Sequence, residues 1–288
     1  MQLDPRLSSI LFCPQCHGDL IIEGQFLHCI SCGRIFSIED GIPLLTSPKS
    51  NQDFDYLSHY EKDARVFDYF EERTGATAHS ERRLREYILS LVPNKSQSIL
   101  DVGCGSAWVA KTFQKSGKFI CSLDVSTENP RKAMECYPSL DHVGVAADAY
   151  HLPFNDDSFD VILATEIIEH VHNPKSFVSE LMRVVKTSGV VIISTPYKEK
   201  IVYELCIHCQ QLTPHNAHLH SWDESLLRAL FVDSIGGWEF YTFNNKFLLF
   251  ARTYPLLQWM PFGMWKTVDK ISNSVLARPV NCILKVKK

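Results

Sequence analysis

A glycine turn between an apolar strand and a helix constrains the fold of this chain most. The strand is Ser98–Val102, the turn is Gly103-Cys104-Gly105, and a helical pattern begins near Ala107. Glycines at such a turn let the backbone approach a ligand closely at the N-terminus of the helix. Ala107 stands where a third glycine would complete the usual motif. The order of these elements indicates the nucleotide-binding beginning of a doubly wound α/β fold.

The following residues continue the alternation of strands and helices. We expect strands at 118–123, 143–147, 158–164 and 190–194, with a helix at about 174–186. Asp124 follows the second strand and Asp148 follows the third, so parallel strands would bring both acids to one edge of the sheet. An acid at the end of the second strand can accept both hydroxyls of a ribose. The pattern therefore predicts a nucleotide-type site at the carboxyl edge.

Five stretches of sequence, in this order and spacing, resemble the class I S-adenosylmethionine-dependent methyltransferases, specifically the type 11 group. They are DVGCGSA, LDVS, ADAYHLPFNDDSFDVI, ATEIIEHV and TSGVVIISTP, which together span about residues 96–195. The resemblance implies a doubly wound, seven-stranded Rossmann-like sheet and S-adenosyl-L-methionine as the cofactor. A dehydrogenase with the same first turn would not be expected to contain the ADAxxLPF and EHV segments.

The resemblance also implies a role for individual residues of the cofactor site. They are Asp101, Gly103 and Gly105 for the methionine part, Asp124 for the ribose hydroxyls, Asp148 for the adenine amino group, Ala149 stacked nearby, and Thr165 near the methyl group.

Two later strands, at 238–243 and 281–286, fit the hairpin that ends the sheet in this family and makes one strand antiparallel. We therefore expect the methyltransferase domain at 96–288, with insertions at 196–222 and 246–279. Residues 49–95 are polar and mixed in charge, and we expect a linker and one or two helices there.

Two CxxC pairs near the N-terminus predict a structural zinc site. The ligands would be Cys13 and Cys16 together with Cys29 and Cys32, and four thiolates close the tetrahedral shell. A redox motif or two reduced pairs is the alternative, but a redox CxxC does not come doubled at this spacing. Residues 1–48 resemble the zinc-ribbon activator subunits of RNA and protein methyltransferases. So short a unit would depend on the metal for its folding energy.

A second zinc site is expected in the first insertion, with Cys206, Cys209, His218 and His220 as its ligands. His208 and His215 are competing ligands, and reduced cysteines with polar loop histidines are the alternative. Because the loop follows the fifth strand, it should overhang the active-site crevice. The metal could order a lid over the acceptor.

His170 is the candidate general base, since it lies just past the fourth strand and an imidazole titrates near neutral pH. Two other roles stay open. Some relatives, among them small-RNA and ubiquinone-pathway O-methyltransferases, use an ExxEH stretch like Glu166-Ile-Ile-Glu169-His170 to hold a divalent metal. Alternatively, Glu169 and His170 only orient the following loop.

Charge is distributed unevenly along the chain. The formal net charge is −4, but residues 246–288 carry eight Lys or Arg and one acid, Asp269, which leaves −11 on residues 1–245. The second insertion is also rich in aromatic and apolar residues. It suits a lid over an apolar acceptor, a peripheral membrane contact or a buried cap on the sheet. The acidic body makes nucleic acid a less favoured partner.

These features predict a methyltransferase that acts on a small molecule, a lipid-linked intermediate or a glycan. An RNA methyltransferase with a zinc module is the alternative enzyme, and a non-catalytic binding partner is the alternative of another class. We find no signal peptide and no run of 18 apolar residues, so we expect the protein in the cytoplasm.

Overall fold

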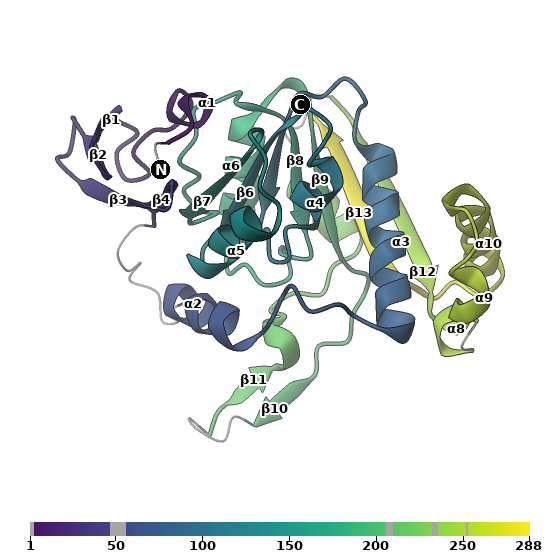
Figure 1. Cartoon of the computed structure of the whole chain (residues 1–288). Coiled ribbons are helices and arrows are strands. Elements are labelled where there is room, and N and C mark those ends of the chain that lie inside the picture. Colours follow the sequence, from purple (N-terminus) through teal and green to yellow (C-terminus); the bar gives the residue numbers. More distant parts are fainter. Residues whose placement is uncertain (1–2, 47–55, 206–209, 232–235, 252) are drawn as a thin grey trace.

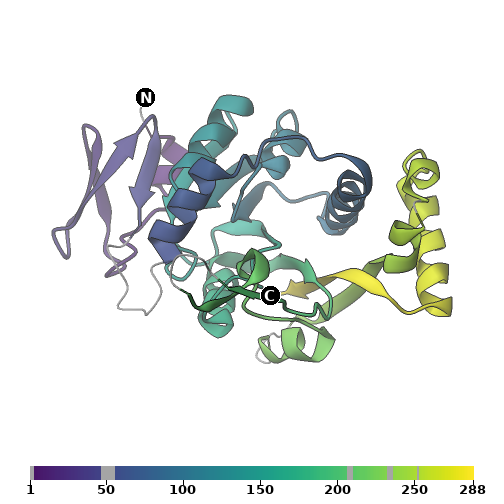
Figure 2. The ribbon, with the colours of Figure 1, turned by 90° about the horizontal axis from the view of Figure 1, so that it is seen from below.

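The computed structural model describes residues 3–46, 56–205, 210–231, 236–251 and 253–288. Its main feature is an eleven-stranded mixed sheet in the order β1-β2-β3-β4-β7-β6-β5-β8-β9-β13-β12. The seven strands from β7 to β12 form the predicted methyltransferase sheet, and the other four come from the N-terminal ribbon. Figures 1 and 2 show the ribbon at one end of the molecule and the helices that follow β12 at the other.

Five neighbouring strands of the sheet are parallel. They are β5 (Ser98–Val102), β6 (Phe119–Asp124), β7 (His142–Ala147), β8 (Phe159–Thr165) and β9 (Val185–Pro196). The chain ends with β13 (Pro279–Lys287), which pairs antiparallel with both β9 and β12 (Trp238–Asn245). The expected single antiparallel strand is thus confirmed.

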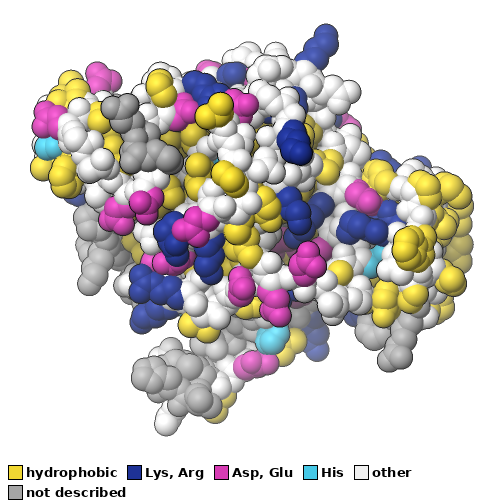
Figure 3. Space-filling model, in the orientation of Figure 1, with side chains coloured by type: hydrophobic (Ala, Val, Ile, Leu, Met, Phe, Trp, Pro, Cys, Tyr) yellow, Lys and Arg dark blue, Asp and Glu magenta, His cyan; other side chains and the backbone are white. Residues whose placement is uncertain are grey.

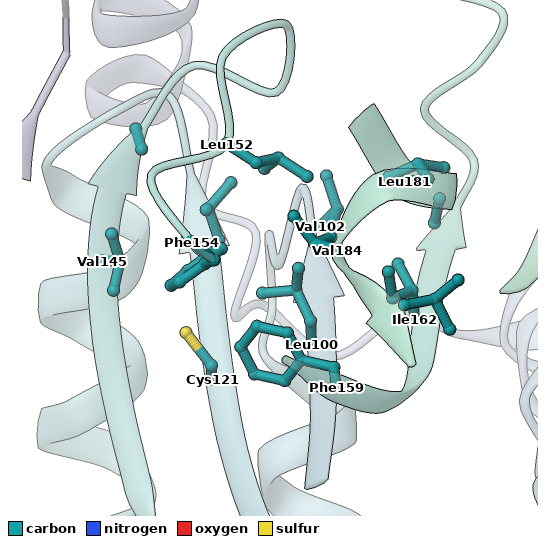
Figure 4. Close-up of a cluster of buried hydrophobic side chains, with 14 of the residues drawn as sticks. Leu100, Val102, Cys121, Val145, Leu152, Phe154, Phe159, Ile162, Leu181 and Val184 are labelled. Atoms are coloured by element: carbon teal, nitrogen blue, oxygen red, sulfur yellow. The ribbon is translucent and has the colours of Figure 1, made fainter. Parts of the chain in front are cut away.

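Helices cover both faces of this sheet. One face carries α6 (Pro174–Val184) and α7 (Glu224–Ala229), and the other carries α3 (Gly75–Leu91), α4 (Trp108–Phe113) and α5 (Glu128–Cys136). In α6 the buried residues Phe177, Leu181 and Val184 recur at helical spacing and face the core. Figure 4 shows Leu181 and Val184 beside strand residues such as Val102 and Ile162. The two-faced covering explains why the parallel strands are apolar almost throughout.

The N-terminal ribbon consists of α1 (Pro5–Ser8) and four short strands. They are β1 (Leu20–Glu23), β2 (Phe26–Cys29), β3 (Ile35–Glu39) and β4 (Ile42–Leu45). Strand β4 pairs in parallel with β7, where Leu44 lies opposite Ala146 and Leu45 opposite Ala147. Nearby, the Phe12 amide donates to the Pro153 carbonyl at 3.0 Å. The ribbon therefore extends the methyltransferase sheet, a join that sequence analysis did not predict.

The remaining elements lie in the linker and in the two expected insertions. The linker forms α2 (Tyr56–Val66) and leads into α3. The first insertion contains β10 (Tyr203–Leu205), β11 (Leu212–Pro214) and a 3₁₀ turn (His215–Ala217). The second contains α8 (Lys246–Phe250), α9 (Tyr254–Leu257) and α10 (Phe262–Val275). Among the described residues, no helix is long and apolar enough to cross a bilayer.

Candidate active site and zinc centre

The glycine turn after β5 is held against the next strand. The amides of Gly103 and Cys104 both donate to the Leu123 carbonyl, each at 2.9 Å. Gly103 and Gly105 have φ of 70° and 43°, values that L side chains rarely adopt. A Cβ on Gly103 would lie 2.8 Å from Cδ1 of Ile167. The turn thus needs glycine for its backbone and for the space around it.

Ala107, in the place of a third glycine, has the left-handed conformation that glycine adopts most readily, with φ 49° and ψ 37°. A non-glycine residue in this region is strained by roughly 1–2 kcal/mol. Its methyl group is fully buried in the cluster formed by α3, α4 and their strands. Packing of that methyl group offsets part of the strain.

Asp101 and Asp124 lie on adjacent strands at the carboxyl edge, and both are buried. Burial and the neighbouring Asp124 raise the pKa of the Asp101 carboxyl well above its usual value. Burial likewise raises the pKa of Asp124, although hydrogen bonds oppose it: the Ser126 amide donates to Oδ1 at 3.0 Å and the Asn129 side chain to Oδ2 at 3.1 Å. Two buried acids side by side at this edge, both with a raised pKa, indicate a site for a ligand with donor groups.

Asp148 follows β7 and completes the row of acids. Its Oδ2 accepts a hydrogen bond from the Tyr56 hydroxyl of α2, and its Oδ1 accepts from the Tyr150 amide at 2.9 Å. Ala149 is half-buried beside the main core cluster. Thr165 ends β8 on the far side of β5.

Two buried polar atoms at this edge bear on whether the residues here could hold S-adenosylmethionine. Within the described residues, Oδ2 of Asp101 and Oγ1 of Thr165 have no hydrogen-bond partner. A buried polar atom without a partner is costly, and a ligand that brings an ammonium group and hydroxyls would supply donors. The glycine turn ahead of α4 and the row of acids agree with the same ligand. The residues fit the cofactor.

Helix α2 lies over this edge, which Figure 1 shows below the sheet. Tyr56 contacts Asp148, and Glu61 accepts hydrogen bonds from the amide and the hydroxyl of Thr127 at 2.9 and 3.0 Å. After the helix, the ring of Tyr69 reaches the Gly105 turn. Sequence reasoning missed this cover. The tyrosines at Tyr56 and Tyr60, one helical turn apart in a charged segment, were the available signal.

On the other side of β5 from these acids, Glu169 and His170 follow β8 as expected. Oε2 of the buried Glu169 accepts a hydrogen bond from the Thr195 hydroxyl at 2.9 Å. The Glu169 carbonyl accepts from the amides of Leu219 and His220, so the first insertion packs directly on this corner. Burial raises the pKa of Glu169 well above its usual value, and the nearby Glu166 adds to the effect.

The His170 ring is oriented by the first insertion. Its Nδ1 lies 3.3 Å from the Ala217 carbonyl, so Nδ1 carries the hydrogen and Nε2 keeps its lone pair. The ring also meets His218 edge to face, with centroids 4.8 Å apart. Burial, with a smaller contribution from His218, lowers the pKa of His170 to about 4. His170 is therefore neutral at pH 7, and its pKa lies below the near-neutral value expected from the sequence, because the ring is buried.

The expected second zinc site divides between described and undescribed residues. Cys206 and Cys209 lie outside the described residues, so this site stays a prediction. Nδ1 of His218 lies 2.5 Å from Oε2 of Glu199, whereas Nε2 of His220 donates to the Val171 carbonyl at 2.9 Å. Ligand atoms of Glu169, His170 and His218 all lie within 4.8 Å of one another, close enough to share a cation.

The four N-terminal cysteines converge as the sequence predicts. Their sulfur atoms all lie within 4.8 Å of one another, with Cys13 Sγ 3.7 Å from Cys32 Sγ and Cys16 Sγ 3.4 Å from Cys29 Sγ. Four sulfurs around one zinc at the usual bond length would lie about 3.8 Å apart. This donor set therefore fits zinc.

The turns after the two cysteine pairs need glycine for different reasons. His17 has the positive φ, 59°, and not Gly18. Glycine is needed at 18 for another reason, because a Cβ there would lie 2.3 Å from Oγ of Ser31. At the second pair, Gly33 itself has a positive φ, 72°.

Comparison with known proteins agrees with the resemblances found for the N-terminal unit and for the α/β domain. Residues 100–193 match the family described as Methyltransferase domain, and residues 4–41 match Trm112p-like protein. The ubiquinone biosynthesis O-methyltransferase of Rickettsia bellii is 31% identical over 129 residues, which cover 43% of this chain and 53% of that protein. The chain thus spans about half the length of the curated relatives it matches.

Solved structures share the fold at low identity. The [4+2]-cyclase SpnF has a TM-score of 0.56 at 17% identity, and the similarity covers 85% of this chain and 98% of the cyclase. A complex between the Haloferax volcanii Trm112 methyltransferase activator and a methyltransferase gives a TM-score of 0.51 at 18% identity, covering 82% of this chain and 99% of the matched one. The chain therefore carries a methyltransferase-family domain at 100–193 preceded by a Trm112p-like unit at 4–41, and it shares the α/β fold of these solved structures.

Proposed function

We propose that the protein transfers a methyl group from S-adenosylmethionine to a small-molecule, lipid-linked or glycan acceptor. The observation that carries this proposal is the arrangement at one sheet edge. Three buried acids line the side of β5, β6 and β7, and Glu169 with His170 lies across from them after β8. Relatives named ubiquinone biosynthesis O-methyltransferase support a small acceptor that is methylated on oxygen.

On the cofactor side, each acid would hold a different donor group. Asp101, whose Oδ2 has no partner among the described residues, would accept from the ammonium group. Asp124 would accept from the ribose hydroxyls, and Asp148 would accept from the adenine amino group. The Tyr56 hydroxyl already donates to Oδ2 of Asp148. If the adenine amino group used that oxygen, Tyr56 and helix α2 would have to move when the cofactor binds.

On the acceptor side, the chain has to position the acceptor and remove its proton. The bound cofactor supplies a methyl group on a sulfonium, which is already a strong methyl donor. We assign His170 as the base, because its Nε2 keeps a lone pair while Nδ1 is bound to the Ala217 carbonyl. Glu169 and the first insertion would hold that ring in place.

A divalent cation is the second candidate for the same corner. The observation that favours it is the closeness of ligand atoms of Glu169, His170 and His218. Oxygen and imidazole ligands suit several divalent metals. If a cation acts here, chelation should abolish turnover and added Mg²⁺ or Mn²⁺ should restore it. Turnover that is unaffected by a chelator would leave His170 as the base.

The division of the chain is part of the proposal: a zinc ribbon at 1–48, a linker with helices at 49–95 and the methyltransferase domain at 96–288.

Calorimetric titration with S-adenosylmethionine tests the cofactor site without knowledge of the acceptor. Binding followed by transfer of labelled methyl to a hydroxyl-bearing small molecule would support the proposal. Binding without transfer to any acceptor class would favour a partner protein. Transfer to RNA would favour the alternative enzyme.

A further inference from the structure

Helix α10 has two apolar faces, of which only one is buried. Trp265 and Asp269 face inward, and Trp265 packs in the cluster with α3 and β12. Met264, Ile271 and Val275 face outward and are 60%, 59% and 78% exposed. They follow one another by seven and four residues, which places them on one stripe of the helix. An outward apolar stripe on a surface helix is a candidate contact surface.

Other exposed apolar side chains lie on the neighbouring elements of the same lobe, which we define as residues 246–278. Leu256 and Trp259 are 80% and 84% exposed, and Phe247 is exposed as well. Figure 3 shows hydrophobic side chains gathered over this lobe, and Figure 2 shows the lobe standing away from the rest of the molecule. Single exposed apolar residues are ordinary, but several on one small lobe, a tryptophan among them, are not.

The lobe is fixed to the body by α3. Nη2 of the buried Arg83 donates to the carbonyls of Leu257 at 2.5 Å and of Met260 at 2.8 Å, and its guanidinium lies over the Trp265 ring. The exposed surface is therefore presented by a folded element with defined contacts.

The exposed charged side chains of the lobe are basic. Its sequence contains five basic residues and a single acid, Asp269. The structure buries that acid, whose Oδ1 accepts from the Asn245 amide at 2.8 Å. Lys246, Lys270 and Arg278 are exposed. Two copies of such a surface would repel each other, whereas an anionic surface would attract it.

We propose that this lobe docks the protein onto an anionic lipid bilayer. The exposed apolar side chains would enter the boundary between headgroups and acyl chains, and the tryptophan suits that boundary. The basic side chains would meet anionic headgroups, whose negative surface potential attracts them. This inference goes beyond the proposed function, because it requires neither cofactor nor acceptor.

The test is flotation of the full-length protein with two kinds of vesicle, one of phosphatidylcholine alone and one that also contains phosphatidylglycerol. We expect binding to the second kind only, and we expect it to weaken at high salt. Leu256→Glu should reduce the partition coefficient at least about tenfold, because it places a charge in the apolar contact. Leu140→Glu is the matched control: Leu140 is 92% exposed and lies outside the lobe, so this variant should bind as the unmodified protein does.

Two results would overturn the proposal. In the first, the protein would not bind the anionic vesicles or would lose binding equally in both variants. In the second, light scattering would show a dimer that Leu256→Glu dissociates, which identifies a second copy as the occupant. Calorimetry with S-adenosylmethionine on the same variants separates these outcomes from failure of the proposed function, since the cofactor should bind in all of them.

Discussion

Among single residues, Asp124 has the most specific proposed role, that of acceptor for the ribose hydroxyls. We expect Asp124→Ala to weaken S-adenosylmethionine binding by roughly 1.5–3 kcal/mol, because the ribose would lose a charged acceptor. Calorimetry measures the change, and thermal unfolding checks that the variant is folded. A folded variant with unchanged cofactor affinity would remove Asp124 from the site.

His170 is the proposed general base on the acceptor side. Replacing it by glycine should reduce turnover by roughly 10²- to 10⁴-fold if it is the base. Cofactor affinity and the unfolding temperature should change little, and added imidazole should restore part of the rate. His172→Gly, at an exposed position two residues on, is the control. A loss of stability without rescue by imidazole would instead assign His170 an orienting role.

At the scale of elements, the zinc ribbon depends on its four thiolates. Elemental analysis should find about two zinc ions per chain, one in the ribbon and one in the first insertion. Replacing Cys13 and Cys16 by serine should remove one ion and destabilise the ribbon. Cys136→Ser, at an exposed free cysteine, should leave the metal content unchanged. Protein without zinc and with freely reactive thiols would contradict both sites.

The first insertion should act on the acceptor side and not on the cofactor side. It packs on Glu169 through the amides of Leu219 and His220, and the Ala217 carbonyl orients His170. Cys206→Ser should therefore abolish most turnover while cofactor affinity stays within about threefold, which is less than ~1 kcal/mol. Parallel loss of cofactor binding and turnover would show that the loop supports the whole site.

Helices and strands could be predicted where the residues that begin and end them are neighbours in the sequence. Strand β5 begins and ends as expected, because it is buried throughout and stops at a glycine turn. Helix α6 ends at Val184 and not near 186, because Val185 already pairs with Phe159 of β8. The cover formed by α2 could not be predicted, since its contact with Asp148 joins residues 92 positions apart. Pairings of this kind depend on the assembled fold.

For the whole molecule, the pairing of β4 with β7 should make the ribbon and the methyltransferase domain unfold together. Zinc release and the change in tryptophan fluorescence should then follow one thermal transition. Leu45→Asp, at a fully buried position of β4, should lower stability by roughly 3 kcal/mol or more. Ile21→Asp, on the exposed face of β1, should change it little. Zinc release well before the main transition would show two independent units.

The same strand pairing has a consequence for how the ribbon meets its domain. An activator that is a separate subunit associates in a second-order reaction, so its occupancy falls when the proteins are diluted. Here both partners belong to one chain, and β4 reaches β7 in a first-order step at a fixed effective concentration. The ratio of ribbon to catalytic domain is therefore always one to one. Moreover, the β7 edge is occupied within the chain, so a free ribbon from another protein has no strand there with which to pair.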